Sequence, residues 1–177
     1  MNTVYYYFNK TGEEKNIIEK GKLTPLSLTK NKKTLIKYLG KSGIKNSDEH
    51  FENIYNRLYK PVLKTKYKNS GIYLSPINFL HFKNSYKGRF EINYENIWRH
   101  DSVIIIDREV KILTRTVLSE IQNIYSDDLV KNLYFKALHS RKLIFEYLPQ
   151  IVVFADEIVV DESMLVLREK REQLVEF

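Results

Sequence analysis

The chain contains no cysteine, and this absence excludes two kinds of site at once. Without thiols the protein forms no disulfide and holds no metal through thiolate ligands. Four histidines are present, but His50, His81, His100 and His139 do not occur at the H-x-x-x-H or H-x-H spacing typical of zinc sites. We therefore expect no metal centre.

Long hydrophobic runs are missing as well. No stretch approaches the roughly 20 apolar residues that a membrane-spanning helix requires. The first residues, Met1-Asn2-Thr3, lead into tyrosines and then charge rather than into an apolar signal core. We expect a cytoplasmic protein that does not enter a membrane, and secretion as an effector without a cleaved signal is the alternative.

Aromatic and basic residues are abundant instead. Of 177 residues, 43% are hydrophobic and 13 are tyrosine, which is enough for a single domain spanning residues 1–177. The charge is uneven, because residues 1–100 carry 19 Lys or Arg against 8 Asp or Glu, whereas residues 101–177 carry 10 against 14. The basic half suits a polyanion such as nucleic acid or a nucleotide phosphate. A lysine-rich composition with no binding role is the alternative interpretation.

Hydrophobic patterns predict an α+β fold. Residues 4–8 are β-branched and aromatic, residues 90–94 alternate between apolar and polar, and residues 103–106 form a continuous apolar run. All three patterns are typical of strands. Further strands are expected at residues 110–113, 151–154, 158–160 and 164–167. We expect a split, mainly antiparallel sheet with flanking helices.

Helices are predicted before and between these strands. Thr11 and Glu14 have the spacing of a capping box, in which both side chains accept backbone N–H groups at the start of a helix. Gly21 suits the left-handed residue that follows the end of that helix. Apolar residues at i, i+3, i+4 and i+7 predict an amphipathic helix over residues 51–58. Two more helices are expected at residues 117–125 and 127–140.

One short segment points to a particular chemistry. Gly71-Ile72-Tyr73-Leu74-Ser75 follows, in chain order, the tyrosine-rich strand at residues 4–8, the capped helix and Gly21-Lys22-Leu23. This order resembles the opening of the ADP-ribosyltransferase-like superfamily, in particular small bacterial and phage toxin or effector domains of the His-Tyr-Glu/Gln type. The resemblance implies a split sheet, binding of NAD, and transfer of ADP-ribose to a protein or nucleic-acid acceptor.

The resemblance assigns cofactor-binding roles to three residues. Tyr73 corresponds to the tyrosine that stacks on the nicotinamide ring, and Ser75 belongs to the same segment. Tyr6 stands where the family has a histidine that holds the adenosine ribose. A phenol can donate a hydrogen bond to a ribose hydroxyl, but it is not a cation near pH 7.

The third member of the set is expected on a late strand. Pro149-Gln150 precedes an apolar run, where the family often has Pro-Glu, so the resemblance implies that Gln150 contacts the ribose or the acceptor. A glutamine cannot serve as a general base. Glu146 and Glu157 flank this segment and are the alternative catalytic carboxylates.

Basic residues near these motifs are candidates for contacts with phosphate or nucleic acid. Tyr6, Tyr73 and Gln150 are expected to line the cleft that binds NAD. Lys64, Lys66 and Lys68 lie in the basic segment before the Gly-x-Tyr strand, where they would flank the mouth of this cleft. Arg99 and His100 follow the single tryptophan and could bind a phosphate or a base. A surface turn with no binding role is the alternative for the last two.

A different class of function is also compatible with the sequence. Single-strand nucleic-acid readers combine a cationic groove with stacking rings, and the lysines and tyrosines of this chain fit that description. A small basic nucleic-acid-binding or protein-interaction module of phage or mobile-element type, without catalysis, is therefore the second hypothesis. Its affinity for nucleic acid would fall steeply with salt and would not respond to NAD.

Overall fold

A computed structural model describes residues 2–27, 70–78, 86–106, 109–140 and 147–168. Some sequence-based expectations lie outside these described residues. They concern the helix at residues 51–58, together with Lys64, Lys66, Lys68 and Glu146.

The tyrosine-rich N-terminal segment forms β1 (Thr3–Phe8), the edge of a three-stranded sheet. The central strand is β5 (Gly88–Asn93), and β10 (Leu165–Leu167) pairs with its other side. Both pairings are antiparallel. Along β5, Phe90 and Ile92 are fully buried while their neighbours are not, so the predicted alternation of apolar and polar residues is confirmed.

A second, five-stranded sheet has the order β3-β4-β8-β6-β7. These strands are β3 (Leu26–Ser27), β4 (Ser70–Leu74), β6 (Asp101–Ile106), β7 (Glu109–Ile112) and β8 (Gln150–Phe154).

The central position of β8 explains its continuous apolar sequence. Successive strand residues point to opposite faces of a sheet. Ile151 and Val153 belong to the main hydrophobic core, and Val152 and Phe154, on the opposite face, are also fully buried.

A two-stranded ribbon completes the described β structure. It pairs β2 (Lys22–Leu23) with β9 (Ile158–Val159), again antiparallel. Two short 3-10 turns are also present: η2 (Tyr94–Asn96) directly follows β5, and η4 (Glu162–Met164) directly precedes β10.

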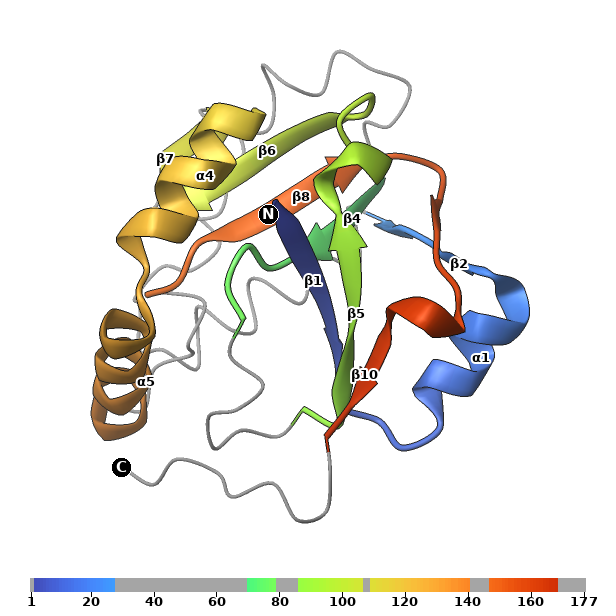
Figure 1. The fold of residues 1–177 in the computed structure, drawn as a ribbon, viewed down its shortest axis with the longest axis horizontal. Coiled ribbons are helices and arrows are strands. Elements are labelled where there is room, and N and C mark those ends of the chain that lie inside the picture. Colours follow the sequence, from blue (N-terminus) through green and yellow to red (C-terminus); the bar gives the residue numbers. More distant parts are fainter. Residues whose placement is uncertain (1, 28–69, 79–85, 107–108, 141–146, 169–177) are drawn as a thin grey trace.

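Two helices pack on one side of the sheets, at the left of Figure 1. The first, α4 (Arg115–Ile124), begins where the Thr114 hydroxyl accepts the N–H of Val117, and it buries Leu118. The second, α5 (Asp127–Ser140), begins where the Ser126 hydroxyl accepts the N–H of Leu129. The sequence predicted both helices, at residues 117–125 and 127–140.

The helix α1 (Glu13–Lys20) lies on the opposite side, beside β2. Its predicted capping box is wrong. The residue before the helix is Gly12, which adopts the left-handed conformation (φ 87°), and no side chain caps this end. The C-terminal prediction is confirmed, because Gly21 is left-handed (φ 69°) and its N–H bonds to the carbonyls of Ile17 and Ile18.

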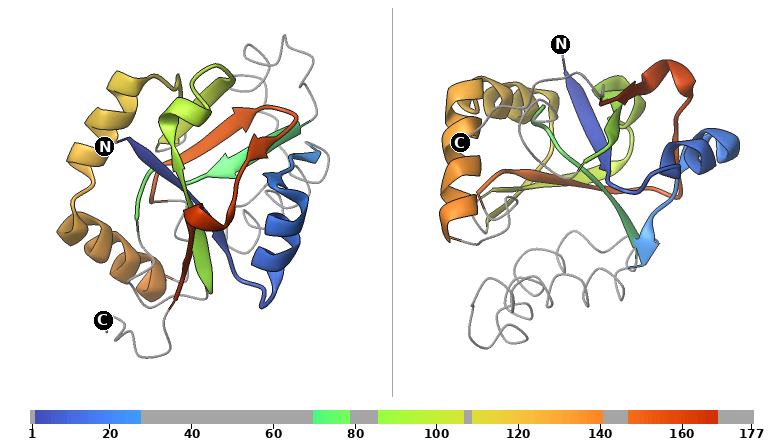
Figure 2. Two further views of the ribbon diagram at one scale, coloured as in Figure 1. Left: turned by 45° about the vertical axis from the view of Figure 1, so that its right-hand side comes forward. Right: turned by 90° about the horizontal axis from the view of Figure 1, so that it is seen from below.

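The two larger sheets cross and share a core. Figures 1 and 2 show β1, β5 and β10 lying across one face of the sheet that contains β8 and β6. Phe90, Ile92, Ile151 and Val153 belong to the same buried cluster between them. Every strand pairing among the described residues is antiparallel, so the fold is α+β with antiparallel sheets. In the described part of the chain, no helix has the length and apolar character needed to span a membrane.

Candidate functional site

The short strand β4 is the junction of the two larger sheets. One edge pairs with β8, with Tyr73 opposite Val152. The other edge meets β3 at its start, where Gly71 is opposite Leu26, and meets β1 at its end. There the N–H of Tyr5 donates to the carbonyl of Ser75 (2.8 Å), and the N–H of Ser75 donates to the carbonyl of Tyr5 (2.7 Å).

A pocket of about 390 Å³ opens where β1, α1, β2 and β4 come together, and we call it the notch. The Gly-x-Tyr strand contributes Gly71, Ile72 and Tyr73 to its lining. The first strand contributes Tyr6, so two of the residues that the resemblance expects in one cleft do share a pocket. The other described lining residues come from α1 and from β2 with the residue after it: Glu13, Asn16, Ile17, Lys20, Lys22, Leu23 and Thr24.

Tyr6 is a neutral hydrogen-bonding group in this notch. Its hydroxyl donates to Glu13 Oε1 over a long 3.5 Å. Burial, the negative charge of Glu13 and the hydrogen bond to it raise the pKa of Tyr6 to about 12. Tyr6 therefore keeps its proton at physiological pH and can act as a donor but not as a cation.

Gly71 has a packing role that explains the glycine of the Gly-x-Tyr segment. A Cβ atom at this position would lie 2.7 Å from Val152 Cγ1, on the neighbouring strand β8. Tyr73 is the next residue on the same face of β4 and is half-buried, with Val152 as its cross-strand partner. The absence of a side chain at Gly71 therefore lets β4 and β8 approach closely beside Tyr73.

Two lysines lie at the notch, where they make the local potential more positive. Lys20 is exposed, and Lys22 Nζ lies 3.1 Å from Glu157 Oε2. Both members of this ion pair are about half exposed, at 43% and 48%, so solvent screens it and it contributes little to stability. A ligand phosphate can therefore replace the Glu157 carboxylate as the partner of Lys22 with little loss of protein stability.

Gln150 and Ser75 are close to β4 but are not among the described residues that line the notch. Gln150 begins β8 and pairs with Ile105 of β6, on the same face as Val152. The Ser75 hydroxyl donates to the carbonyl of Ile77 (3.0 Å) and accepts the N–H of the same residue (3.1 Å). Ser75 thus fixes the turn after β4 as well as joining β4 to β1.

The remaining predicted residues lie elsewhere. Glu157 and His100 line a separate pocket of about 420 Å³, beside the exposed Val159 of β9. The guanidinium of Arg99 stacks over the ring of the exposed Trp98, 5.2 Å from its centroid. Arg99 and His100 are therefore not among the described residues that line the notch.

Several notch residues belong to no motif of the sequence. Glu13, Asn16, Ile17 and Lys20 recur at i, i+3, i+4 and i+7, so they form one face of α1. That face combines a carboxylate, an amide, an apolar group and a cation. Such a mixed face directly after a predicted site strand is the signal that could have identified these residues.

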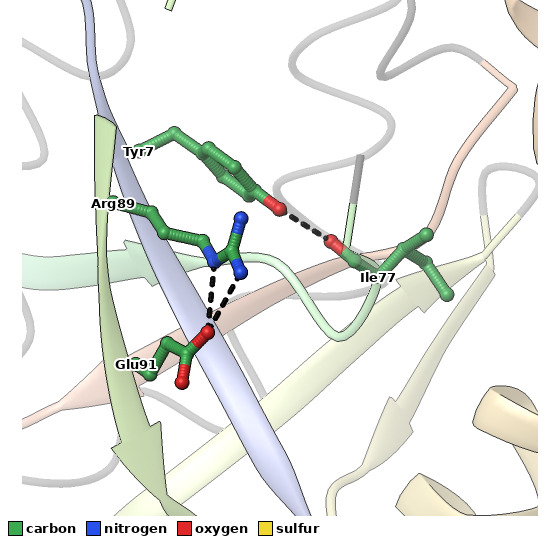
Figure 3. Close-up of polar contacts among 4 residues, drawn as sticks. All are labelled: Tyr7, Ile77, Arg89 and Glu91. Carbon is green, nitrogen blue, oxygen red and sulfur yellow. Dashed lines mark hydrogen bonds and ion pairs between the residues drawn. The ribbon is translucent and has the colours of Figure 1, made fainter. Parts of the chain in front are cut away.

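The other face of β1 and β5 carries a different polar arrangement (Figure 3). The Tyr7 hydroxyl donates to the carbonyl of Ile77 (3.1 Å), which ties β1 to the turn after β4. Beside it, Arg89 donates to Glu91 Oε1 from Nε (3.2 Å) and from the terminal guanidinium nitrogen (2.7 Å). The guanidinium also lies over the ring of Tyr5, 5.4 Å from its centroid.

No protein-family model, curated protein or solved structure matched the chain. Among the described residues there is no group of three or more acidic or histidine side chains that could hold a metal ion. The candidate site is therefore defined by the geometry of the notch and by the chemistry of its lining.

Proposed function

We propose that the notch binds NAD and that the protein is an ADP-ribosyltransferase-like enzyme, transferring ADP-ribose to a macromolecular acceptor. One observation carries the proposal. Tyr6 from the first strand and Tyr73 from the Gly-x-Tyr strand, far apart in the sequence, line one pocket. The resemblance expects these two positions to act together on NAD.

The lining fits the parts of the dinucleotide. A volume of about 390 Å³ is within the usual range of small-molecule pockets, roughly 300–1,000 Å³. Tyr73 offers a ring for the nicotinamide, and the neutral Tyr6 hydroxyl can donate to a ribose. Lys20 and Lys22 provide positive charge for the pyrophosphate.

The reaction needs little more than positioning and one well-placed charge. The bond between ribose C1′ and the nicotinamide nitrogen breaks, and neutral nicotinamide leaves with the electron pair. The acceptor nucleophile then forms a bond to C1′ and loses its proton. A carboxylate near the ribose stabilises the cationic sugar that develops between these events. We assign this role to Glu13, the carboxylate among the described notch residues. Gln150 remains a predicted contact of the ribose or the acceptor.

The proposal is tested by measuring binding of NAD and of nicotinamide mononucleotide by titration calorimetry. Base–aromatic stacking is worth about 1–3 kcal/mol, so Tyr73→Ala should raise the dissociation constant of the mononucleotide about 5- to 150-fold. The matched control is Tyr147→Ala, because Tyr147 is also partly exposed but does not line the notch. If Tyr73→Ala folds normally and binds the mononucleotide as tightly as the parent, the notch is not the site.

A further inference from the structure

We propose that a second pocket, on the other side of β1 from the notch, binds an adenine nucleoside through Asn78. This pocket has a volume of about 430 Å³ and is lined by the start of β1, the turn after β4, α4 and the first residue of α5. We call it the amide pocket, because Asn2, Asn78, Gln122 and Asn123 all contribute to its wall.

The amide pocket is held in shape by hydrogen bonds among its own residues. Gln122 Nε2 on α4 donates to the carbonyl of Thr3 (2.7 Å) and to the carbonyl of Pro76 (3.1 Å). The Ser119 hydroxyl, one turn earlier on α4, donates to Asn2 Oδ1 (3.0 Å). Three separate segments are thus fixed together. The pocket residues therefore lose less conformational entropy when a ligand binds.

Tyr5 supplies an aromatic surface at this pocket. Arg89 lies over its ring and is held by Glu91, as Figure 3 shows for the ion pair. Burial and the charge of Glu91 raise the pKa of Tyr5, with Arg89 acting in the opposite direction, so the ring carries a neutral hydroxyl. Rings of this kind are the surfaces on which nucleobases stack.

Asn78 selects the base. Its Oδ1 atom is buried and has no hydrogen-bond partner among the residues that the structure describes. A buried carbonyl oxygen without a donor is unfavourable, so a small rotation toward a ligand N–H in the pocket is favoured. Adenine matches an asparagine amide in two places, because its amino group donates to Oδ1 and its N7 accepts from Nδ2.

The charge of the lining favours a nucleoside over a free phosphate. The described residues of the amide pocket include the carboxylate of Asp127 but no lysine, arginine or histidine. A carboxylate accepts hydrogen bonds from ribose hydroxyls and repels phosphate oxygens. The natural source of the ligand is therefore either free adenosine or an unpaired adenosine residue in a single strand.

The test is titration of the full chain with adenosine and with inosine, in which a carbonyl replaces the amino group. We expect adenosine to bind, and we expect inosine to bind about tenfold more weakly because one of two base contacts is lost. Asn78→Leu removes both base contacts, so it should weaken adenosine binding about a hundredfold. Its melting temperature should not fall, because a buried carbonyl oxygen without a donor is replaced by an apolar group of similar size. Asn132→Leu, on the exposed surface of α5, is the matched control and should bind adenosine as the parent does.

Three results would overturn this assignment: no adenosine binding at millimolar concentration, equal affinity for adenosine and inosine, or unchanged adenosine binding by folded Asn78→Leu. A short oligoadenylate that binds more tightly than adenosine, with a steep salt dependence, identifies a single strand as the source. Equal affinities for the oligoadenylate and for adenosine identify the free nucleoside as the source. Nicotinamide mononucleotide, which has no adenine, is titrated in parallel, so failure of the notch to bind it is distinguishable from failure of the amide pocket.

Discussion

Replacing Gly71 with alanine tests the packing that brings β4 against β8 beside the notch. In an ordinary strand, glycine to alanine stabilises by about 0.5–1 kcal/mol, because glycine has more conformational freedom to lose. Here the new Cβ would lie 2.7 Å from Val152 Cγ1 and 4.0 Å from Phe154 Cε1. Val152 and Phe154 are both fully buried, so neither can move toward solvent. Overpacking of this kind costs about 1–3 kcal/mol, and the expected sign is therefore reversed.

The contact can be isolated with a double-mutant cycle. Val152→Ala alone should destabilise by about 2 kcal/mol, from lost burial and the cavity left behind. It also removes the Cγ1 atom that the Gly71→Ala methyl would meet, so the double variant should be about 1–2 kcal/mol more stable than the sum of the single effects predicts.

The assay is urea unfolding of the parent, the two single variants and the double variant. Gly88→Ala serves as the control, because its new Cβ would lie 2.7 Å from the carbonyl oxygen of Val166, a backbone atom that trimming Val152 cannot relieve. Combining it with Val152→Ala should give additive effects. The reasoning is refuted if Gly71→Ala is as stable as the parent, or if its coupling to Val152→Ala is below about 0.5 kcal/mol.

Two further predictions concern Tyr6 and Glu13. Because the pKa of Tyr6 is raised to about 12 in the folded protein, the unfolded chain ionises first as pH rises above 10, and the free energy of unfolding falls. This loss is about 1.4 kcal/mol at pH 11, so Tyr6→Phe should show a smaller drop in stability between pH 8 and pH 11 by urea unfolding. An equal drop in both proteins contradicts the burial of Tyr6 beside a carboxylate. Glu13→Gln should slow nicotinamide release from NAD at least tenfold while changing NAD affinity less, measured by single-turnover and binding assays. Loss of affinity with an unchanged rate removes Glu13 from the chemistry.

The local patterns of the sequence were sufficient to locate most elements. Alternation predicted β5, a continuous apolar run predicted β6, and helices were predicted where α4 and α5 lie. The capping box at Thr11 failed because Gly12 adopts a left-handed conformation at the helix start, which removes the geometry that the Thr11 hydroxyl needs. A competing backbone conformation at one residue was enough to override the motif.

The candidate site was only partly predictable, for a reason of sheet order. The sequence indicates which segments are strands, but it does not say which strands are neighbours. Since β4 lies between β8 and β1, which meets Ser75 at Tyr5, Gln150 is separated from the first strand, whereas Tyr6 and Tyr73 both line the notch. The mixed face of α1 that carries Asn16 and Lys20 can be found in the sequence, but where that face packs is a tertiary effect that no local pattern records.

The junction strand has a consequence for the newly synthesised protein. The five residues of β4 depend on β8 for one edge and on β1 and β3 for the other, so its neighbours come from both early and late parts of the translated chain. Domains assemble from the N-terminus as the ribosome advances. A nascent chain that has not yet exposed residues 150–154 leaves β4 with one edge unsupported, so we expect the notch to form only after this late part of the chain has left the ribosome.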